Sequence, residues 1–213
     1  MKSLLLGIVL IIIVGFGGLV YRNAVEYSTR PITCPLDAMT CPDGTSVART
    51  GTSCTFPACP LPNTTLPDIG VAFAIPDGFT AAALPDAASV AAYEQTAMSS
   101  ELARIIVRQY AIEASSTALM TIQQTAMNGA SGMPAPTTAY SSTMLGSHRF
   151  TVVSLERFEG IIDTAYYLAR STDVLRFDAI DRGVPNWTNP NLDTALLPAH
   201  RALIRLLATL QGR

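Results

Sequence analysis

The sequence predicts an α+β fold in which helices cover an antiparallel sheet. Segments with alternating apolar residues recur along the second half of the chain, and very short gaps such as Gly146-Ser147 and Ser171-Thr172 separate them. Gaps this short join antiparallel neighbours, because parallel strands need a crossover of a dozen or more residues. Two segments with helical spacing interrupt the series. Apolar residues make up 49% of the 213 residues, enough for one sizeable core.

The expected order of elements is a strand, a hairpin, a helix, a four-stranded meander and a closing helix. The first strand alternates Val71, Phe73 and Ile75 with small residues and stops at the turn Pro76-Asp77-Gly78. Thr117 and the two serines before it offer a cap for the first helix. We expect strands at 71–75, 91–98, 102–112, 139–145, 148–157, 161–170 and 174–181, and helices at 118–129 and 198–210.

Two stretches carry a family resemblance. One is F-A-I-P-D-G-F at residues 73–79, which closes the first strand, and the other is L-I-R-L-L-A-T-L-Q at residues 203–211 in the closing helix. With the element order, they make residues 69–213 resemble the PsbP-like (Mog1/PsbP/DcrB) fold family. The resemblance implies a non-enzymatic, extracytoplasmic domain that binds partner proteins and is often attached to a membrane. It supplies no metal-binding or ligand-binding residues.

The N-terminal segment, residues 1–22, predicts a membrane anchor. Lys2 precedes an uncharged apolar run from Leu4 to Val20, and Tyr21-Arg22 would lie at the membrane interface. At about 1.5 Å per residue the run spans roughly 25 Å, a little less than a bilayer core of about 30 Å. We expect an uncleaved transmembrane helix, with a cleaved signal peptide as the alternative. The protein would then be a single-pass membrane protein with the bulk of its chain in the cell envelope or periplasm.

Four cysteines lie in a module that we assign to residues 31–60. Their spacing, C-x6-C-x12-C-x4-C, lacks the C-x-x-C pairs that are typical of zinc and redox sites, so we expect two disulfides and no metal. The module has too few large apolar residues to fold unaided, and disulfides would replace the missing core. Of the three possible connectivities we favour the interleaved one, which pairs Cys34 with Cys54 and Cys41 with Cys59.

Residues 41–60 of this module, CPDGTSVARTGTSCTFPACP, resemble a short CPDGT-type cysteine module of predicted secreted proteins, whose role is not established. The proline, aspartate and glycine at 42–44 indicate a turn, which would place Arg49 on an exposed hairpin as a partner contact. A protease-inhibitor loop is one interpretation, and a spacer between membrane and domain is the other. Residues 61–68 read as a proline-rich linker between the module and the α+β domain at 69–213.

Side chains that could carry chemistry are few. His148 and His200 are the only histidines, and no G-x-S-x-G elbow or phosphate-binding glycine loop occurs. We expect both histidines at the surface, and Asp178 and Asp181 as solvated charges at a strand end. The net charge of −2 and the single lysine argue against nucleic-acid binding. Trp187, in a loop rich in asparagine and proline, is a possible partner contact.

These observations predict a membrane-anchored, extracytoplasmic binding or accessory protein without enzymatic activity or a cofactor. Its partners would be the membrane, through the N-terminal helix, and an envelope protein or a cell-surface component. Two alternatives remain open. One is a secreted hydrolase with a non-standard site built on His148 or His200, and the other is a protease-inhibitor-like cysteine module.

Overall fold

The computed structural model describes residue 7 and residues 11–22, 34–41, 46–59, 61–95, 102–128, 131–155 and 157–212. The chain divides into two compact units. One unit comprises residues 1–38 and 48–57, and the other comprises residues 39–47 and 58–213. The second unit contains the two larger sheets and the helices that pack on them.

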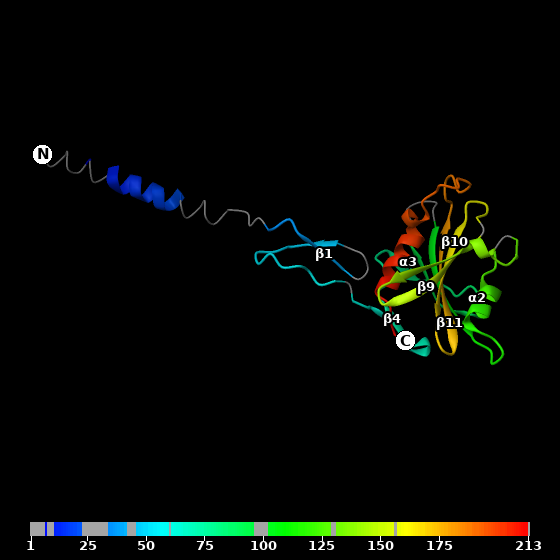
Figure 1. The fold of residues 1–213 in the computed structure, drawn as a ribbon. Coiled ribbons are helices and arrows are strands. Elements are labelled where there is room, and N and C mark those ends of the chain that lie inside the picture. The colour runs from blue at the N-terminus through cyan, green and yellow to red at the C-terminus, as the bar shows by residue number, and fades with distance from the viewer. Residues whose placement is uncertain are drawn as a thin grey trace. The chain divides into compact units, whose positions relative to one another are not determined.

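A seven-stranded antiparallel sheet forms the centre of the second unit (Figure 1), with the strand order β5-β6-β7-β11-β10-β9-β8. The two longest strands, β7 and β11, pair at its middle over their whole length. Because they have neighbours on both sides, almost every residue of β11 is buried. The strands are β5 (Phe79–Ala81), β6 (Ser89–Gln95), β7 (Leu102–Ala111), β8 (Tyr140–Leu145), β9 (His148–Ser154), β10 (Ile162–Ala169) and β11 (Asp173–Arg182).

Two smaller sheets accompany the large one. A three-stranded sheet has the order β12-β4-β3, and a two-stranded sheet pairs β1 with β2 in the cysteine module. Single turns of 3-10 helix connect several of the strands. The remaining elements are β1 (Ala38–Thr40), β2 (Ser46–Ala48), β3 (Thr64–Leu66), η1 (Pro67–Ile69), β4 (Val71–Phe73), η2 (Thr137–Ala139), η3 (Thr194–Leu196) and β12 (Gln211–Gly212).

Helices α2 (Ala118–Thr125) and α3 (Pro198–Ala208) lie on opposite faces of the seven-stranded sheet (Figure 1). The Thr117 hydroxyl caps α2 by accepting a hydrogen bond from the backbone N–H of Met120 at 3.2 Å. Helix α3 starts with a proline, and a strand residue caps it. The Asp181 carboxylate of β11 accepts hydrogen bonds from the backbone N–H groups of Ala199 at 2.7 Å and His200 at 3.3 Å.

The core has one cluster on each face of the sheet. The larger cluster joins α3, the small β4 sheet and the inner strands, and Leu203, Leu206 and Leu207 of α3 are fully buried in it. Phe150 packs edge to face against Tyr166 and Phe177 in this cluster. The smaller cluster lies under α2 and contains Ile122, Ala126, Ala135, Val153, Leu155, Ala165, Tyr167 and Val174.

The predicted α+β class is wrong, because the domain is mostly β. Seven strands about 4.8 Å apart make a sheet about 29 Å wide. Helix α2 has 8 residues and α3 has 11, so at 1.5 Å per residue they are only about 12 and 16 Å long. The small β4 sheet, which the sequence interpretation did not anticipate, joins α3 in the larger core cluster.

The expected hairpin and meander are confirmed, since β6–β7 and β8–β11 pair in the predicted order. The first predicted strand is misplaced, however. Residues 71–73 form β4 outside the large sheet, and its partner β3 lies within residues 61–68, the expected linker. The edge strand β5 was missed, because its residues 79–81 include only one β-branched side chain.

The predicted transmembrane helix is not found among the described residues. Residues 11–22 are helical with exposed side chains. Within the described part of the chain, no helix has both the length and the apolar character that a membrane crossing requires. The start of the apolar run and the turn at 42–44 lie outside the described residues.

Replacing Asp181 by alanine should lower the free energy of unfolding by about 1–3 kcal/mol, because two N–H groups at the start of α3 would lose their buried acceptor. Urea denaturation of the full chain measures this loss. The matched control is Glu113→Ala, which removes an exposed carboxylate and should change stability by less than about 0.5 kcal/mol. Equal stabilities for the Asp181 variant and the unmodified protein would contradict the capping role.

Candidate functional site

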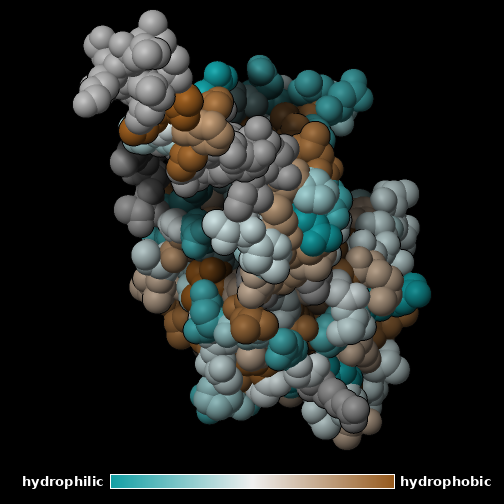
Figure 2. Space-filling view, turned by 90° about the vertical axis from the view of Figure 1, so that its left-hand side faces the viewer, coloured by the Kyte–Doolittle hydropathy of each residue, from teal (hydrophilic) through white to brown (hydrophobic). Residues whose placement is uncertain are grey.

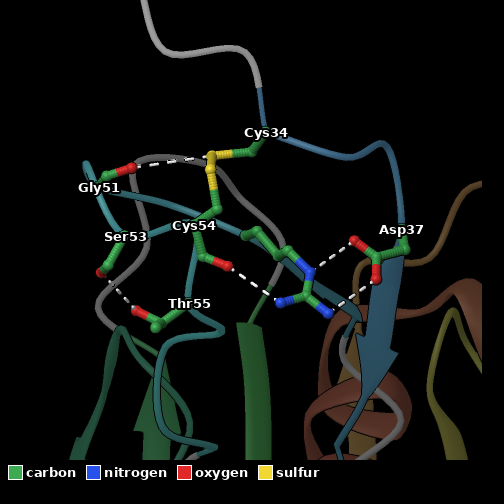
Figure 3. The surroundings of a disulfide bond; sticks show 7 residues. Cys34, Asp37, Gly51, Ser53, Cys54 and Thr55 are labelled. Carbon is green, nitrogen blue, oxygen red and sulfur yellow. Dashed lines mark hydrogen bonds and ion pairs between the residues drawn. A yellow bond between two sulfur atoms is a disulfide. The ribbon is translucent and has the colours of Figure 1, made fainter.

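Two disulfides close the cysteine module. Cys34 is bonded to Cys54 (Figure 3), and Cys41 is bonded to Cys59. This is the interleaved pairing that the sequence analysis favours. No cysteine is free, so none of the four is available as a metal ligand. Disulfides form and persist in oxidising compartments, and the module therefore indicates an extracytoplasmic environment.

Arg49, one of the two predicted partner contacts, is engaged within the module (Figure 3). Its guanidinium donates hydrogen bonds to both carboxylate oxygens of Asp37, at 2.7 and 3.0 Å, and to the carbonyl of Cys54, at 3.0 Å. The same group lies over the Phe56 ring, 4.2 Å from its centroid. The hydrogen bond from Arg49 lowers the pKa of Asp37. Arg49 therefore contributes to the order of the module.

Trp187, the other predicted contact, is partly buried in the loop that connects β11 to η3. This loop lies against the turn between β9 and β10. The backbone N–H of Val184 donates to the carbonyl of Gly160 at 3.0 Å, and the Arg157 guanidinium donates to the carbonyl of Asn189 at 2.8 Å. We call residues 157–161 and 183–190 together the two-loop surface.

The two-loop surface is held in a defined backbone conformation and still presents aromatic side chains. Glu159 and Asn186 both adopt left-handed φ values, 47° and 58°, which non-glycine residues take mainly in tight turns. Phe158 stays 45% exposed although it follows a paired strand. Together with Trp187, it makes this end of the sheet a candidate contact surface.

The two histidines have structural partners. His200 is buried, contrary to expectation, and the Tyr166 hydroxyl is 2.7 Å from its Nε2. Burial lowers the pKa of His200 and raises that of Tyr166 to about 12, so the hydrogen bond joins a neutral imidazole to a neutral hydroxyl. His148 lies 3.2 Å from the Ser147 hydroxyl and 3.0 Å from the carbonyl of Gly212. In the described residues, no group of three or more His, Cys, Asp or Glu could hold a metal ion.

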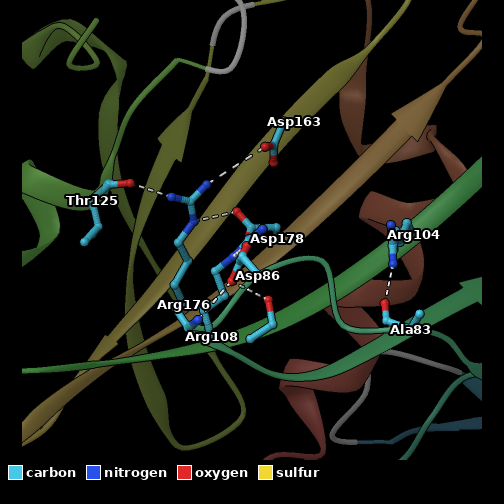
Figure 4. Close-up of polar contacts among 10 residues, drawn as sticks. Ala83, Asp86, Arg104, Arg108, Thr125, Asp163, Arg176 and Asp178 are labelled. Carbon is cyan, nitrogen blue, oxygen red and sulfur yellow. Dashed lines mark hydrogen bonds and ion pairs between the residues drawn. The ribbon is translucent and has the colours of Figure 1, made fainter. Parts of the chain in front are cut away.

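A buried charge network occupies the α2 face of the sheet (Figure 4). Asp178 of β11 is fully buried, contrary to the expectation of a solvated charge. One of its carboxylate oxygens accepts from Arg176 at 2.6 Å, and the other accepts from Arg108. Arg176 also donates to the backbone carbonyl of Thr125 at the end of α2, and Arg108 donates to Asp86 at 2.9 Å. Each arginine therefore links the sheet to a segment that covers it.

The network also perturbs two carboxyl groups. Burial disfavours the charged form of Asp86, but hydrogen bonds from Ser89 and Arg108 outweigh it and lower the pKa of this group. Asp163 has the opposite balance. Its Oδ1 is buried without a hydrogen-bond partner, and Arg176 lies 4.0 Å from its Oδ2. Burial, together with the negative charge of Asp178, raises the pKa of Asp163 to about 8.

A pocket of about 250 Å³ lies beside α3 on the other face of the domain. Arg201 and Arg205, one helical turn apart, form part of its wall. The connection between β4 and β5 completes the pocket with them. The other lining residues are Ala74, Ile75, Pro76, Asp77, Phe79, Gln95, Pro198, Ala202 and Thr209.

No protein-family model matches the chain, and no curated protein matches it. Among solved structures it is similar to a crystal structure from Bacteroides thetaiotaomicron VPI-5482, with a TM-score of 0.42 and 12% sequence identity. The similarity covers 67% of this chain and 45% of that chain. A likeness of this size supports no conclusion about fold or function.

Replacing Asp163 by asparagine should stabilise the protein increasingly as the pH rises from 4 to 8. A carboxyl whose pKa is raised on folding contributes its full stability below its unfolded pKa, 3.8, and loses it as the pH rises toward 8. Asparagine does not titrate. The difference in the free energy of unfolding between the variant and the unmodified protein should therefore increase from pH 4 to pH 8, in favour of the variant, by at least about 1.4 kcal/mol, the equivalent of one pKa unit. Urea denaturation at several pH values measures the difference.

Carboxyl ¹³C NMR of the unmodified chain provides an independent measurement of the same group. We expect the Asp163 signal to titrate well above pH 3.8, the ordinary value. A stability difference that stays constant between pH 4 and 8, with Asp163 ionised throughout that range, would contradict the account.

Proposed function

We propose that the protein is a non-enzymatic, extracytoplasmic accessory protein that binds another protein of the cell envelope through the two-loop surface. In this proposal the apolar segment within residues 1–22 targets the chain to the membrane. The two disulfides support the compartment, because bonds of this kind persist outside the reducing cytoplasm.

The observation that carries the proposal is the combination of exposed aromatic area and an ordered backbone on the two-loop surface. Phe158 is 45% exposed, and hydrogen bonds join its loop to the loop of Trp187. Aromatic side chains on ordered loops bury a large area on binding and lose little conformational entropy, which is why they are common at protein–protein hot spots. In Figure 2, hydrophobic and hydrophilic residues are interspersed over the coloured part of the surface.

A binding role also agrees with the engagement of the histidines. The Nε2 atom of His200 is taken up by Tyr166 inside the core. The ring nitrogens of His148 contact the hydroxyl of Ser147, in the turn before β9, and the backbone carbonyl of Gly212 in β12. A general base needs a free nitrogen within reach of a substrate proton. The Nδ1 atom of His200 has no hydrogen-bond partner but is buried, and both ring nitrogens of His148 are engaged, so neither arrangement favours that role.

Photo-crosslinking in cells that produce the full chain tests this proposal. A photoreactive amino acid is placed at position 187 and, as the matched control, at Ser171. Ser171 is exposed in the β10–β11 turn, at the end of β10 opposite residues 157–161. We expect position 187 to give a discrete adduct with one envelope protein, identified by mass spectrometry, and position 171 to give none with that protein.

The identified partner is then purified, and its affinity for the full chain is measured. Trp187→Ala and Phe158→Ala should each weaken binding by about tenfold or more, because hot-spot truncations cost at least about 1.4–2 kcal/mol. Ser171→Ala should leave the affinity unchanged. The proposal fails if positions 187 and 171 give the same adducts, or if the two aromatic variants bind as well as the unmodified protein.

A further inference from the structure

We propose that the pocket beside α3 binds a small molecule that carries an anionic group, a carboxylate or a phosphate, on a short apolar chain. This site is separate from the two-loop surface, and the proposal does not depend on the protein–protein role. It rests on the two arginines of the pocket, on the apolar residues that line it with them, and on the size of the cavity.

The first observation is that the two arginines lack ion-pair partners among the described residues. Neither Arg201 nor Arg205 forms an ion pair with any described acidic residue, although both line the same pocket. Most other arginines of the domain are engaged by protein groups. Arg104 pairs with Glu94, Arg108 with Asp86 and Asp178, Arg170 with Asp173, Arg176 with Asp178, and Arg157 with the carbonyl of Asn189.

The position of the pair on α3 is the second observation. Residues four apart lie on the same side of a helix, about 6 Å from each other, so two guanidinium groups can reach one anion. Arginine binds carboxylates and phosphates through planar, bidentate hydrogen bonds. Two neighbouring positive charges also repel each other in the empty pocket, and an anion between them would relieve that repulsion.

The rest of the lining defines the kind of molecule that fits. Ile75, Phe79 and Ala202 supply apolar surface, whereas Asp77 adds one negative charge. The volume of about 250 Å³ is below that of typical sites for drug-sized ligands. It suits an anionic head with a few carbon atoms. Because Asp77 is the one acidic residue of the lining, we expect it to oppose binding and to limit the affinity.

Ligand-observed NMR titration of the full chain in lipid nanodiscs tests the proposal, with empty nanodiscs as the blank. The probes are pentanoate and pentyl phosphate, which distinguish the two anionic groups, and 1-pentanol as the uncharged control. We expect at least one anion to bind, with an affinity that falls as the salt concentration rises, and we expect 1-pentanol to bind at least tenfold more weakly.

Three variants connect the binding to this pocket. The double variant Arg201→Gln/Arg205→Gln should weaken anion binding by about tenfold or more, because charge-assisted hydrogen bonds are lost. Arg149→Gln is the matched control, since Arg149 is exposed and does not line the pocket. It should leave the affinity unchanged. Asp77→Asn should strengthen binding, because it removes the opposing charge.

Several outcomes would overturn the proposal. These are an absence of binding by both anions, equal binding of 1-pentanol, and unchanged anion affinity in the double variant. All four substituted side chains lie at the surface, so thermal unfolding should show the variants to be folded. Because the pocket and the two-loop surface share no residue, failure here would leave the crosslink from position 187 intact, and the converse also holds.

Discussion

The buried carboxylate of Asp178 is the interaction on which the α2 side of the domain depends. A charge that is fully removed from water must be neutralised and hydrogen bonded, and Arg176 and Arg108 meet this requirement from β11 and β7. Each of these arginines has a second partner outside the sheet. Arg176 holds the last turn of α2 through the carbonyl of Thr125, and Arg108 holds the loop before β6 through Asp86.

Strand β11 contributes side chains to both faces of the sheet, because successive side chains of a strand alternate between them. Phe177 enters the larger core cluster on the α3 face, while its neighbours Arg176 and Asp178 build the charge network on the α2 face. At its end, Asp181 caps α3. The strand thereby orients the helix that carries Arg201 and Arg205, and the same strand leads into the loop of Trp187. Both proposed sites therefore depend on the position of β11.

Much of the strand order was predictable from local signals. Two-residue turns fix antiparallel neighbours, so the meander from β8 to β11 followed from gaps such as Gly146-Ser147, and Thr117 was recognisable as a helix cap. The charge network was not predictable. Asp178 was expected as a solvated charge near a strand end, but it lies inside β11. Only the pairing of β7 with β11 brings Arg108 to it. The α3 pocket was missed for the same reason, since the β4–β5 connection that completes it is more than a hundred residues away in sequence.

The compartment is the premise of the proposed function, and it rests on the two interleaved disulfides. Peptide mapping by mass spectrometry of protein from the native envelope, alkylated before and after reduction, tests it most directly. Trypsin cleaves after Arg49 and leaves both bonds joining the same two peptides, so digestion with pepsin is needed. The account predicts Cys34 linked to Cys54 and Cys41 linked to Cys59, with no thiol alkylated before reduction. Free thiols in the native protein would contradict it and place the module in a reducing environment.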